Sequence, residues 1–199
     1  TMKNRQNNPD TRTFAEFAEN LRQLLMLAVS YPEYFGMRLA RSGQYPIIEI
    51  HACPADTRRL IGENGRCFRA ITQLINRAGS VTGCEPYLER IRQIDGPELF
   101  MPFSPNPNWP ADRIIDAFRH VLTGCIGSDV RVDRHDAEDS TTLTFWHHVT
   151  PGAWAEGLDA AIRVLATTVG MNNGRYLRTE FRYEPAPSVA GPVGAARAG

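Results

Sequence analysis

A short segment in the first half of the chain has the residue types of a phosphate-binding loop. Gly62 and Gly65 enclose Glu63 and Asn64, and Arg66 follows directly. Glycine on both sides of a two-residue loop lets a sugar-phosphate backbone approach the main chain closely. A helix that begins after such a loop offers unpaired N–H groups and the positive end of its dipole to a phosphate. The segment therefore predicts a phosphate site, although a GxxG sequence alone is also typical of a tight turn.

Basic and polar side chains flank this loop on both sides. Those that follow it recur at steps of three and four residues, which places them on one face of a helix, opposite its apolar face. Such a stripe favours phosphate contact, and it is also typical of a solvated helix face. The candidates for contact with a nucleic-acid backbone outside the loop are Arg58, Arg59, Arg66, Arg69, Gln73 and Arg77.

The hydrophobic pattern predicts the elements that position the loop. Apolar residues at helical spacing indicate a first helix over residues 13–30, and alternating apolar residues indicate strands at 34–41 and 46–52. A short helix from Pro54 through Leu60, a longer helix that ends at Gly79 and a strand within 87–94 follow. The expected order is helix, strand, strand, helix, glycine loop, helix, strand.

This order and the Ile-Gly-x-x-Gly-Arg sequence resemble the K-homology (KH) RNA-binding fold. Because a helix precedes the two strands, the arrangement is similar to the type II, or prokaryotic, KH domain. Residues 15–79, about a third of the chain, are most similar to the small bacterial KH protein A class. A bacterial or phage origin fits this resemblance.

The resemblance implies single-stranded RNA binding without catalysis. It implies that residues 62–65 clamp the RNA backbone and that Arg66 and Arg69 contact phosphates. The candidates for lining an apolar groove beside the loop are Ile48, Ile50, Ile61 and Ile71. Glu63 departs from the Lys or Arg that is common in such loops, and its carboxylate is expected to repel incoming phosphate.

The rest of the chain is predicted to form a Pro-rich junction and a second unit. Residues 96–110 contain five prolines and several large apolar residues, so we expect a junction that packs across the two units. Residues 111–184 predict a second small α+β domain, either generic or at most a degenerate KH-like domain without a GxxG clamp. Its expected role is packing, homo-oligomer formation or contact with a protein partner. Residues 1–12 and 185–199 are predicted to be disordered.

Within this second unit, the pattern predicts a helix at 110–124, strands at 128–134 and 141–149, a helix at 153–169 and a strand at 175–184. Gly124 and Gly127 enclose an apolar pair, which indicates a turn rather than a second clamp.

The sequence gives little support for an enzyme. It contains no GxSxG, P-loop or HExxH signature, and no cofactor or metal is expected. His147 and His148 could suggest a metal site, but neighbouring residues of a strand point to opposite faces and cannot share one ion. The acidic run over residues 133–139 is interpreted as a solvated hairpin turn.

Composition excludes bulk charge as the means of holding nucleic acid. The chain has 22 basic and 22 acidic residues, and residues 1–95 carry a net charge of +3 whereas 96–199 carry −3. Any contact with phosphate is therefore expected in the first half.

Four cysteines without a CxxC pair predict reduced thiols. The lack of an apolar run of about 20 residues and of a signal-peptide pattern predicts a cytoplasmic protein without a membrane partner.

A second hypothesis is a protein-interaction or scaffold module whose KH fold has lost RNA binding. Glu63, the neutral net charge and the acidic second half favour it.

Overall fold

Two α/β halves make up the protein, and the first contains the glycine loop. The computed structural model describes residues 9–42 and 45–185. The elements of the first half are α1 (Pro9–Ala28), the 3-10 turn η1 (Pro32–Tyr34), β1 (Gly36–Ser42), β2 (Tyr45–Ala52), α2 (Pro54–Ile61), the 3-10 turn η2 (Glu63–Gly65), α3 (Arg66–Thr82) and β3 (Tyr87–Gln93). In its sheet, β2 is central, antiparallel to β1 and parallel to β3.

The second half repeats this plan without the short helix and the loop. Its elements are α4 (Ala111–Ile126), β4 (Arg131–Asp136), β5 (Ser140–His147), α5 (Trp154–Asn172) and β6 (Tyr176–Tyr183). The central strand is β5, antiparallel to β4 and parallel to β6. The described chain is thus an α+β fold with two three-stranded mixed sheets, and its fold class agrees with the sequence-based expectation.

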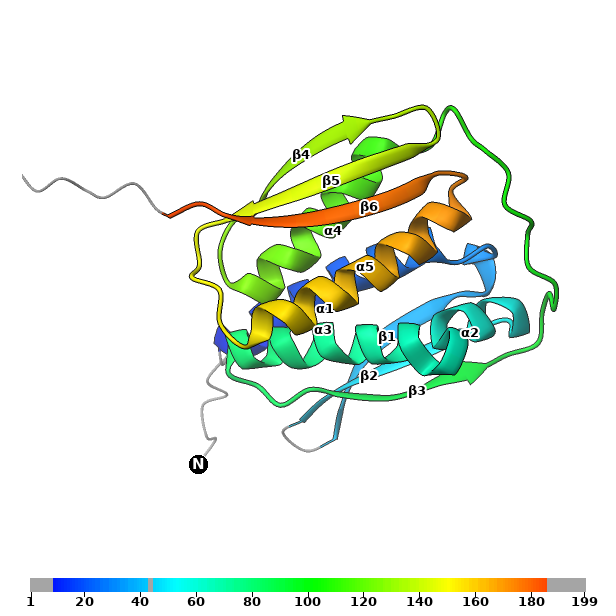
Figure 1. The fold of residues 1–199 in the computed structure, drawn as a ribbon. Helices are drawn as coiled ribbons and strands as arrows, with labels where there is room; N and C mark the ends of the chain where they lie inside the picture. Colours follow the sequence, from blue (N-terminus) through cyan, green and yellow to red (C-terminus); the bar gives the residue numbers. More distant parts are fainter. Residues whose placement is uncertain (1–8, 43–44, 186–199) are drawn as a thin grey trace, which may run out of the picture.

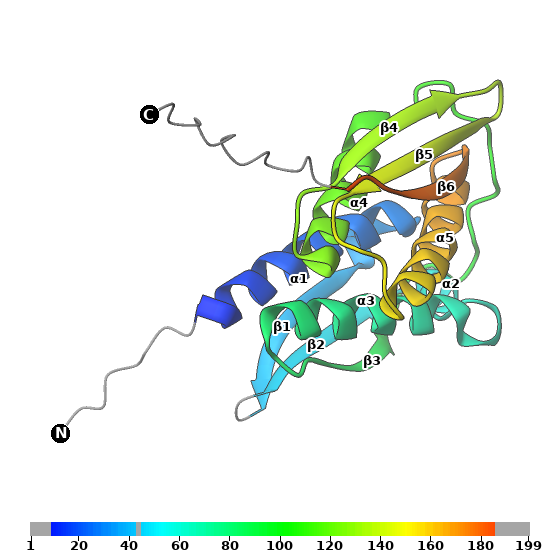
Figure 2. The same ribbon diagram turned by 60° about the vertical axis from the view of Figure 1, so that its left-hand side comes forward.

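The four long helices lie between the two sheets, which form the outer layers (Figure 1). Helix α1 packs against α4 and α3 packs against α5, with further contacts between α3 and α4 and between α1 and α5. Each long helix of the first half therefore packs against both long helices of the second half. Figure 2 shows the same layers from a second direction.

Alternation along the central strands explains why helices cover only one face of each sheet. Ile48 and Ile50 of β2, and Leu143 and Phe145 of β5, are buried, and the residues between them are more exposed. Buried residues from both halves form one continuous hydrophobic cluster. The helix layer is therefore a shared core.

The first helix begins earlier than predicted. Helix α1 starts at Pro9, whereas residues 1–12 were expected to be disordered and the helix to start at 13. Proline is tolerated in the first turn of a helix, because the N–H group that it lacks would have no partner there. Residues 1–8 and 186–199, which the sequence predicts to be disordered, and residues 43–44 lie outside the described residues.

Helix α3 continues through Gly79, where the sequence predicted its end. A Cβ atom at Gly79 would approach Cδ of Pro86 to 2.2 Å, so the missing side chain admits the chain that returns to β3. The helix ends at Thr82, and Gly83 caps it at φ 70°. Helix α5 likewise passes the predicted end at 169, and a Cβ at Gly170 would lie 2.4 Å from the carbonyl oxygen of Arg175. Both glycines serve close packing.

The described segment between β3 and α4, which includes the predicted junction at 96–110, contains no helix or strand and contacts both halves. The N–H of Ala55 donates to the carbonyl oxygen of Pro97 at 3.1 Å, and the N–H of Asn106 donates to that of Gly174 at 3.0 Å. Among the described residues, no helix is long and apolar enough to span a bilayer.

Candidate functional site

The glycine loop, residues 62–65, adopts a backbone that requires glycine. Gly62 and Gly65 both have φ 73°, and Asn64 also lies in the left-handed region at φ 51°. A Cβ atom at Gly62 would lie 2.9 Å from both the backbone nitrogen and Cβ of Cys67. The loop therefore turns tightly against the first turn of α3, as the GxxG sequence predicts.

The start of α3 is open to an anion. Its N-cap is Gly65, which has no side chain to accept the N–H groups of the first turn. The guanidinium of Arg69, one turn further on, donates to the carbonyl oxygen of Asn64 at 2.7 Å. Arg69 thus holds the loop in place and puts positive charge beside the start of α3.

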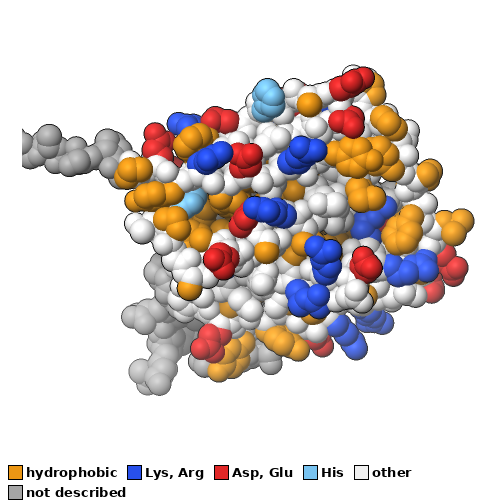
Figure 3. Space-filling view, viewed as in Figure 1, with side chains coloured by type: hydrophobic (Ala, Val, Ile, Leu, Met, Phe, Trp, Pro, Cys, Tyr) orange, Lys and Arg blue, Asp and Glu red, His pale blue; other side chains and the backbone are white. Residues whose placement is uncertain are grey.

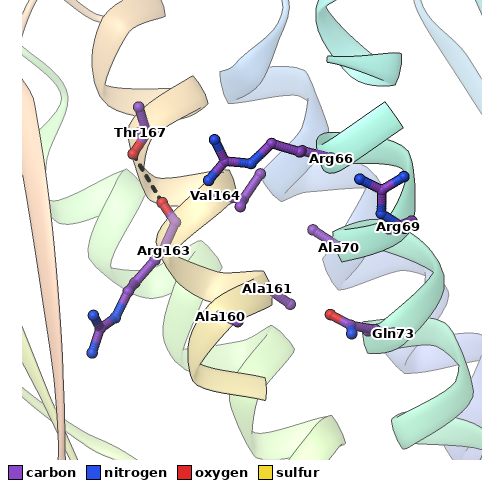
Figure 4. A pocket seen from close by; sticks show the side chains of 9 residues that line it. All are labelled: Arg66, Arg69, Ala70, Gln73, Ala160, Ala161, Arg163, Val164 and Thr167. Carbon is purple, nitrogen blue, oxygen red and sulfur yellow. Dashed lines mark hydrogen bonds between the residues drawn. The ribbon is translucent and has the colours of Figure 1, made fainter. Parts of the chain in front are cut away.

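A groove of about 410 Å³ runs between α3 and α5, next to this loop. We call it the α3–α5 groove; its lining residues are Arg66, Arg69, Ala70, Gln73, Ala160, Ala161, Arg163, Val164 and Thr167. Small residues form its floor and allow the two helices to approach. Figure 4 shows Arg66 reaching from α3 toward α5, whereas the guanidinium of Arg163 extends to the far side of α5.

The lining of the α3–α5 groove is basic. Three of its residues are arginines, and the described residues that line it include no Asp or Glu. Figure 3 shows the corresponding concentration of basic side chains over α3 and α5. In a chain without net charge, this groove is a local concentration of basic residues.

Sequence reasoning did not identify Arg163 or the α5 wall. The only signal in the sequence was that Asp159 and Arg163 are four residues apart. Their side chains form a bidentate ion pair, with hydrogen bonds of 2.6 and 3.0 Å. That spacing is common on solvated helices and gives no hint that α3 lies alongside.

Arg59 was predicted to contact RNA, but it is half-buried and its guanidinium is bonded to other parts of the chain. Its guanidinium donates to Oγ of Ser30 at 2.7 Å and to Oδ1 of Asn172. Burial lowers the pKa of Arg59 below its usual value. Arg59 therefore joins α2 to the ends of α1 and α5, and its guanidinium already has hydrogen-bond partners there.

Arg58 is exposed but already has partners. It donates to the carbonyl oxygen of Glu98, and its guanidinium carbon lies 5.7 Å from the centre of the Phe100 ring. Arg58 therefore belongs to the rim of the site, where it supports the junction segment.

Arg77 also departs from its predicted role. Its guanidinium carbon lies 4.6 Å from the centre of the Trp154 ring, and its Nε is buried without a hydrogen-bond partner in the described part of the chain. Arg77 therefore packs between α3 and α5, whereas Arg66, Arg69 and Gln73 remain exposed at the groove.

Three of the four predicted groove isoleucines are core residues. Ile48, Ile50 and Ile71 are at most 1% exposed, so they have no surface with which to contact a ligand. Ile48 and Ile50 lie on the buried face of β2, as the alternating pattern predicts, and Ile71 of α3 belongs to the same core. Ile61, beside Gly62, is 40% exposed and is the only one of the four that offers apolar surface.

Glu63 is exposed in the glycine loop, but it does not line the α3–α5 groove. Its predicted repulsion of phosphate therefore acts at the edge of the site.

The two neighbouring histidines point apart, as expected for a strand. His147 is 3% exposed, whereas His148 is exposed and its Nδ1 lies 2.7 Å from the carbonyl oxygen of Glu184. Within residues 9–42 and 45–185, no three His, Cys, Asp or Glu side chains are grouped as they would be around a metal ion.

Comparison of the chain with protein-family models, with curated proteins and with solved structures found no match. The case for a function therefore depends on the glycine loop and the α3–α5 groove.

Proposed function

We propose that the protein binds single-stranded RNA without catalysing a reaction, with the sugar-phosphate backbone lying on the glycine loop and along the α3–α5 groove. The observation that carries this proposal is the lining of the groove, to which Arg66 and Arg69 contribute exposed arginine side chains and in which none of the described lining residues is acidic. Guanidinium groups form strong, charge-assisted hydrogen bonds to phosphate oxygens.

The order of elements supports the proposal. The first half has the order that the resemblance to type II KH domains implies. This order is helix, two antiparallel strands, short helix, glycine loop, helix and parallel strand. We assign the second half as a KH-like unit without a clamp, because it has the same strand order but lacks α2 and the loop. In this assignment its role is to provide α5 as the second wall of the groove.

Apolar surface at the edge of the loop favours an unpaired strand over a duplex. Ile61, next to the loop, is 40% exposed, and Phe100, in the segment between the two halves, is 49% exposed. Unpaired bases stack on aromatic and guanidinium planes, whereas a duplex hides these faces.

A scaffold that contacts another protein is the second candidate function. Leu99, Phe100 and Met101 are consecutive and are 80%, 49% and 56% exposed. A run of large exposed apolar side chains is typical of an interaction surface. This candidate needs neither the arginines of the groove nor the glycine loop.

Fluorescence anisotropy with a labelled single-stranded RNA distinguishes the two candidates. Gly65→Asp places a side chain and a negative charge in the loop, and we expect it to abolish binding. Gly83→Asp is the matched control, because it introduces the same residue at nearly the same φ at the other end of α3. Equal binding by both folded variants, or no RNA binding by the unsubstituted protein, would leave the scaffold as the better account.

A further inference from the structure

A second cavity lies on the other side of α5, between the start of this helix and the end of β6. Its volume is about 450 Å³, within the range of small-ligand sites. We call it the His147 pocket. Its lining includes the aromatic rings of His147, Trp154, Phe181 and Tyr183.

The rings of the His147 pocket are arranged around the imidazole. The ring centres of Trp154 and Tyr183 each lie 6.0 Å from that of His147, at interplanar angles of 58° and 51°. The Trp154 ring is also held by the guanidinium of Arg77. Tyr183 is 42% exposed, so one side of the pocket opens to solvent.

His147 has an unused hydrogen-bonding atom. The residue is 3% exposed, and its Nδ1 is buried without a partner among the described residues. An unpaired polar atom in the interior is unfavourable unless a ligand or water satisfies it. Burial also lowers the pKa of His147, which keeps the imidazole neutral near pH 7.

The charged groups around the pocket are largely paired with one another. Arg163 is paired with Asp159 at 2.6 Å, and Arg182 is paired with Glu180 at 3.0 Å. This pairing leaves an aromatic cavity with hydrogen-bonding groups at its edge, which suits a flat, neutral, heteroaromatic ligand. A cationic ligand would find Glu156 and the aromatic faces but would also meet both guanidinium groups.

Arg163 connects the two cavities, because it lines both the α3–α5 groove and the His147 pocket. The two cavities therefore adjoin the same stretch of α5 on its two sides.

We propose that the His147 pocket takes one unpaired nucleobase of the strand bound in the α3–α5 groove. The base would stack against the rings of Trp154 and Tyr183 that surround the imidazole. This inference rests on the proposed function for the source of the base, but the pocket itself can be tested without RNA.

The first experiment uses adenosine and uridine, which have no phosphate, and follows the tryptophan indole N–H signals by NMR. The expected result is a shift of the Trp154 signal, with Trp109 and Trp146 as internal references. Tyr183→Ala should weaken nucleoside binding about tenfold or more, because a stacking partner is lost. Tyr87→Ala removes an exposed tyrosine from β3, outside the pocket, and should change nothing.

A peptide with trimethyllysine tests the rival, cationic ligand. A Trp154 shift with this peptide but with neither nucleoside would overturn the inference, as would no shift with any of the three.

The second experiment measures RNA binding by Tyr183→Ala at several salt concentrations. Weaker binding with an unchanged salt dependence is expected, because a base contact is lost and the phosphate contacts remain. Unchanged affinity would overturn the inference while leaving RNA binding in place. Nucleoside binding without RNA binding would instead support the pocket and overturn the proposed function.

Discussion

The guanidinium of Arg59, in the first half of the chain, donates a hydrogen bond to Oδ1 of Asn172, at the end of the last helix. The side-chain amide of Asn172 in turn donates to the carbonyl oxygen of Val29 at 2.6 Å. These contacts tie the C-terminal ends of α1 and α5 to α2. The two halves are therefore joined by polar contacts as well as by their shared core.

Replacing Arg59 with alanine should destabilise the protein and leave the groove itself unaltered. Hydrogen bonds from a charged group contribute about 1.5–3 kcal/mol, so a loss of this size in the free energy of unfolding is expected. Urea denaturation measures it. Arg58→Ala, which removes an exposed neighbour, should cost about 1 kcal/mol or less. Equal effects of the two substitutions would contradict the inward role of Arg59.

Asp56 should be equally important for stability. Its carboxylate is fully buried and accepts the N–H groups of Ser30 at 2.8 Å and Tyr31 at 2.9 Å. Asp56→Asn keeps the size of the side chain but replaces one acceptor oxygen by an NH₂ group that faces a donor. We expect a loss of about 1–3 kcal/mol in unfolding free energy. Glu33→Gln, on the exposed η1 turn, serves as the control, and a comparable loss there would contradict this assignment.

The four cysteines should differ sharply in reactivity. Burial raises the pKa of Cys67 to about 11, and burial also raises the pKa values of Cys53 and Cys125. Because the thiolate is the reactive form, these three should be protected in the folded protein. Cys84 is partly exposed and should react first. Titration with a chromogenic disulfide reagent should show one fast thiol in the native state, and Cys84→Ser should remove it.

Stability should decrease as the pH falls below the ordinary pKa of histidine, partly because of His147. Burial lowers the pKa of this imidazole in the folded state, so at acidic pH the unfolded chain takes up its proton more readily. The stabilisation that neutral His147 provides is present above about pH 6.5 and is lost as the pH falls toward its lower folded pKa. Unfolding free energies at pH 7.5 and 5.5 should therefore differ more for the unsubstituted protein than for His147→Gln. An identical difference would contradict the prediction.

Local patterns predicted the elements and the loop, because these depend on short-range chemistry. Alternation at Ile48 and Ile50 identified β2, and the pair Gly62 and Gly65 identified a turn that needs left-handed backbone. What the patterns could not supply was the docking of one half on the other. Periodicity puts the stripe of α3 on one face, but only the packing of α5 decides which of its residues stay exposed.

The consequence is clearest for two arginines of similar sequence context. Arg66 remains at the open groove, whereas Arg77, three turns further along the same stripe, is packed against Trp154. Its aliphatic stem and flat guanidinium can cover an aromatic ring, so a basic residue does not mark a solvent-exposed position. The same docking makes Arg163 part of the groove lining. Nothing in the sequence predicted this, because Arg163 belongs to the half of the chain with a net negative charge.

The most direct test of the account is the salt dependence of RNA binding when charge is removed from the groove. Arg66→Ala with Arg69→Ala should weaken binding and reduce the slope of log affinity against log salt by about 1.4, since each phosphate contact on a single strand contributes about 0.7. Arg90→Ala with Arg92→Ala removes the same charge from exposed positions on β3 and should preserve the slope. Equal slopes for both double variants and the unsubstituted protein would contradict RNA binding in the α3–α5 groove.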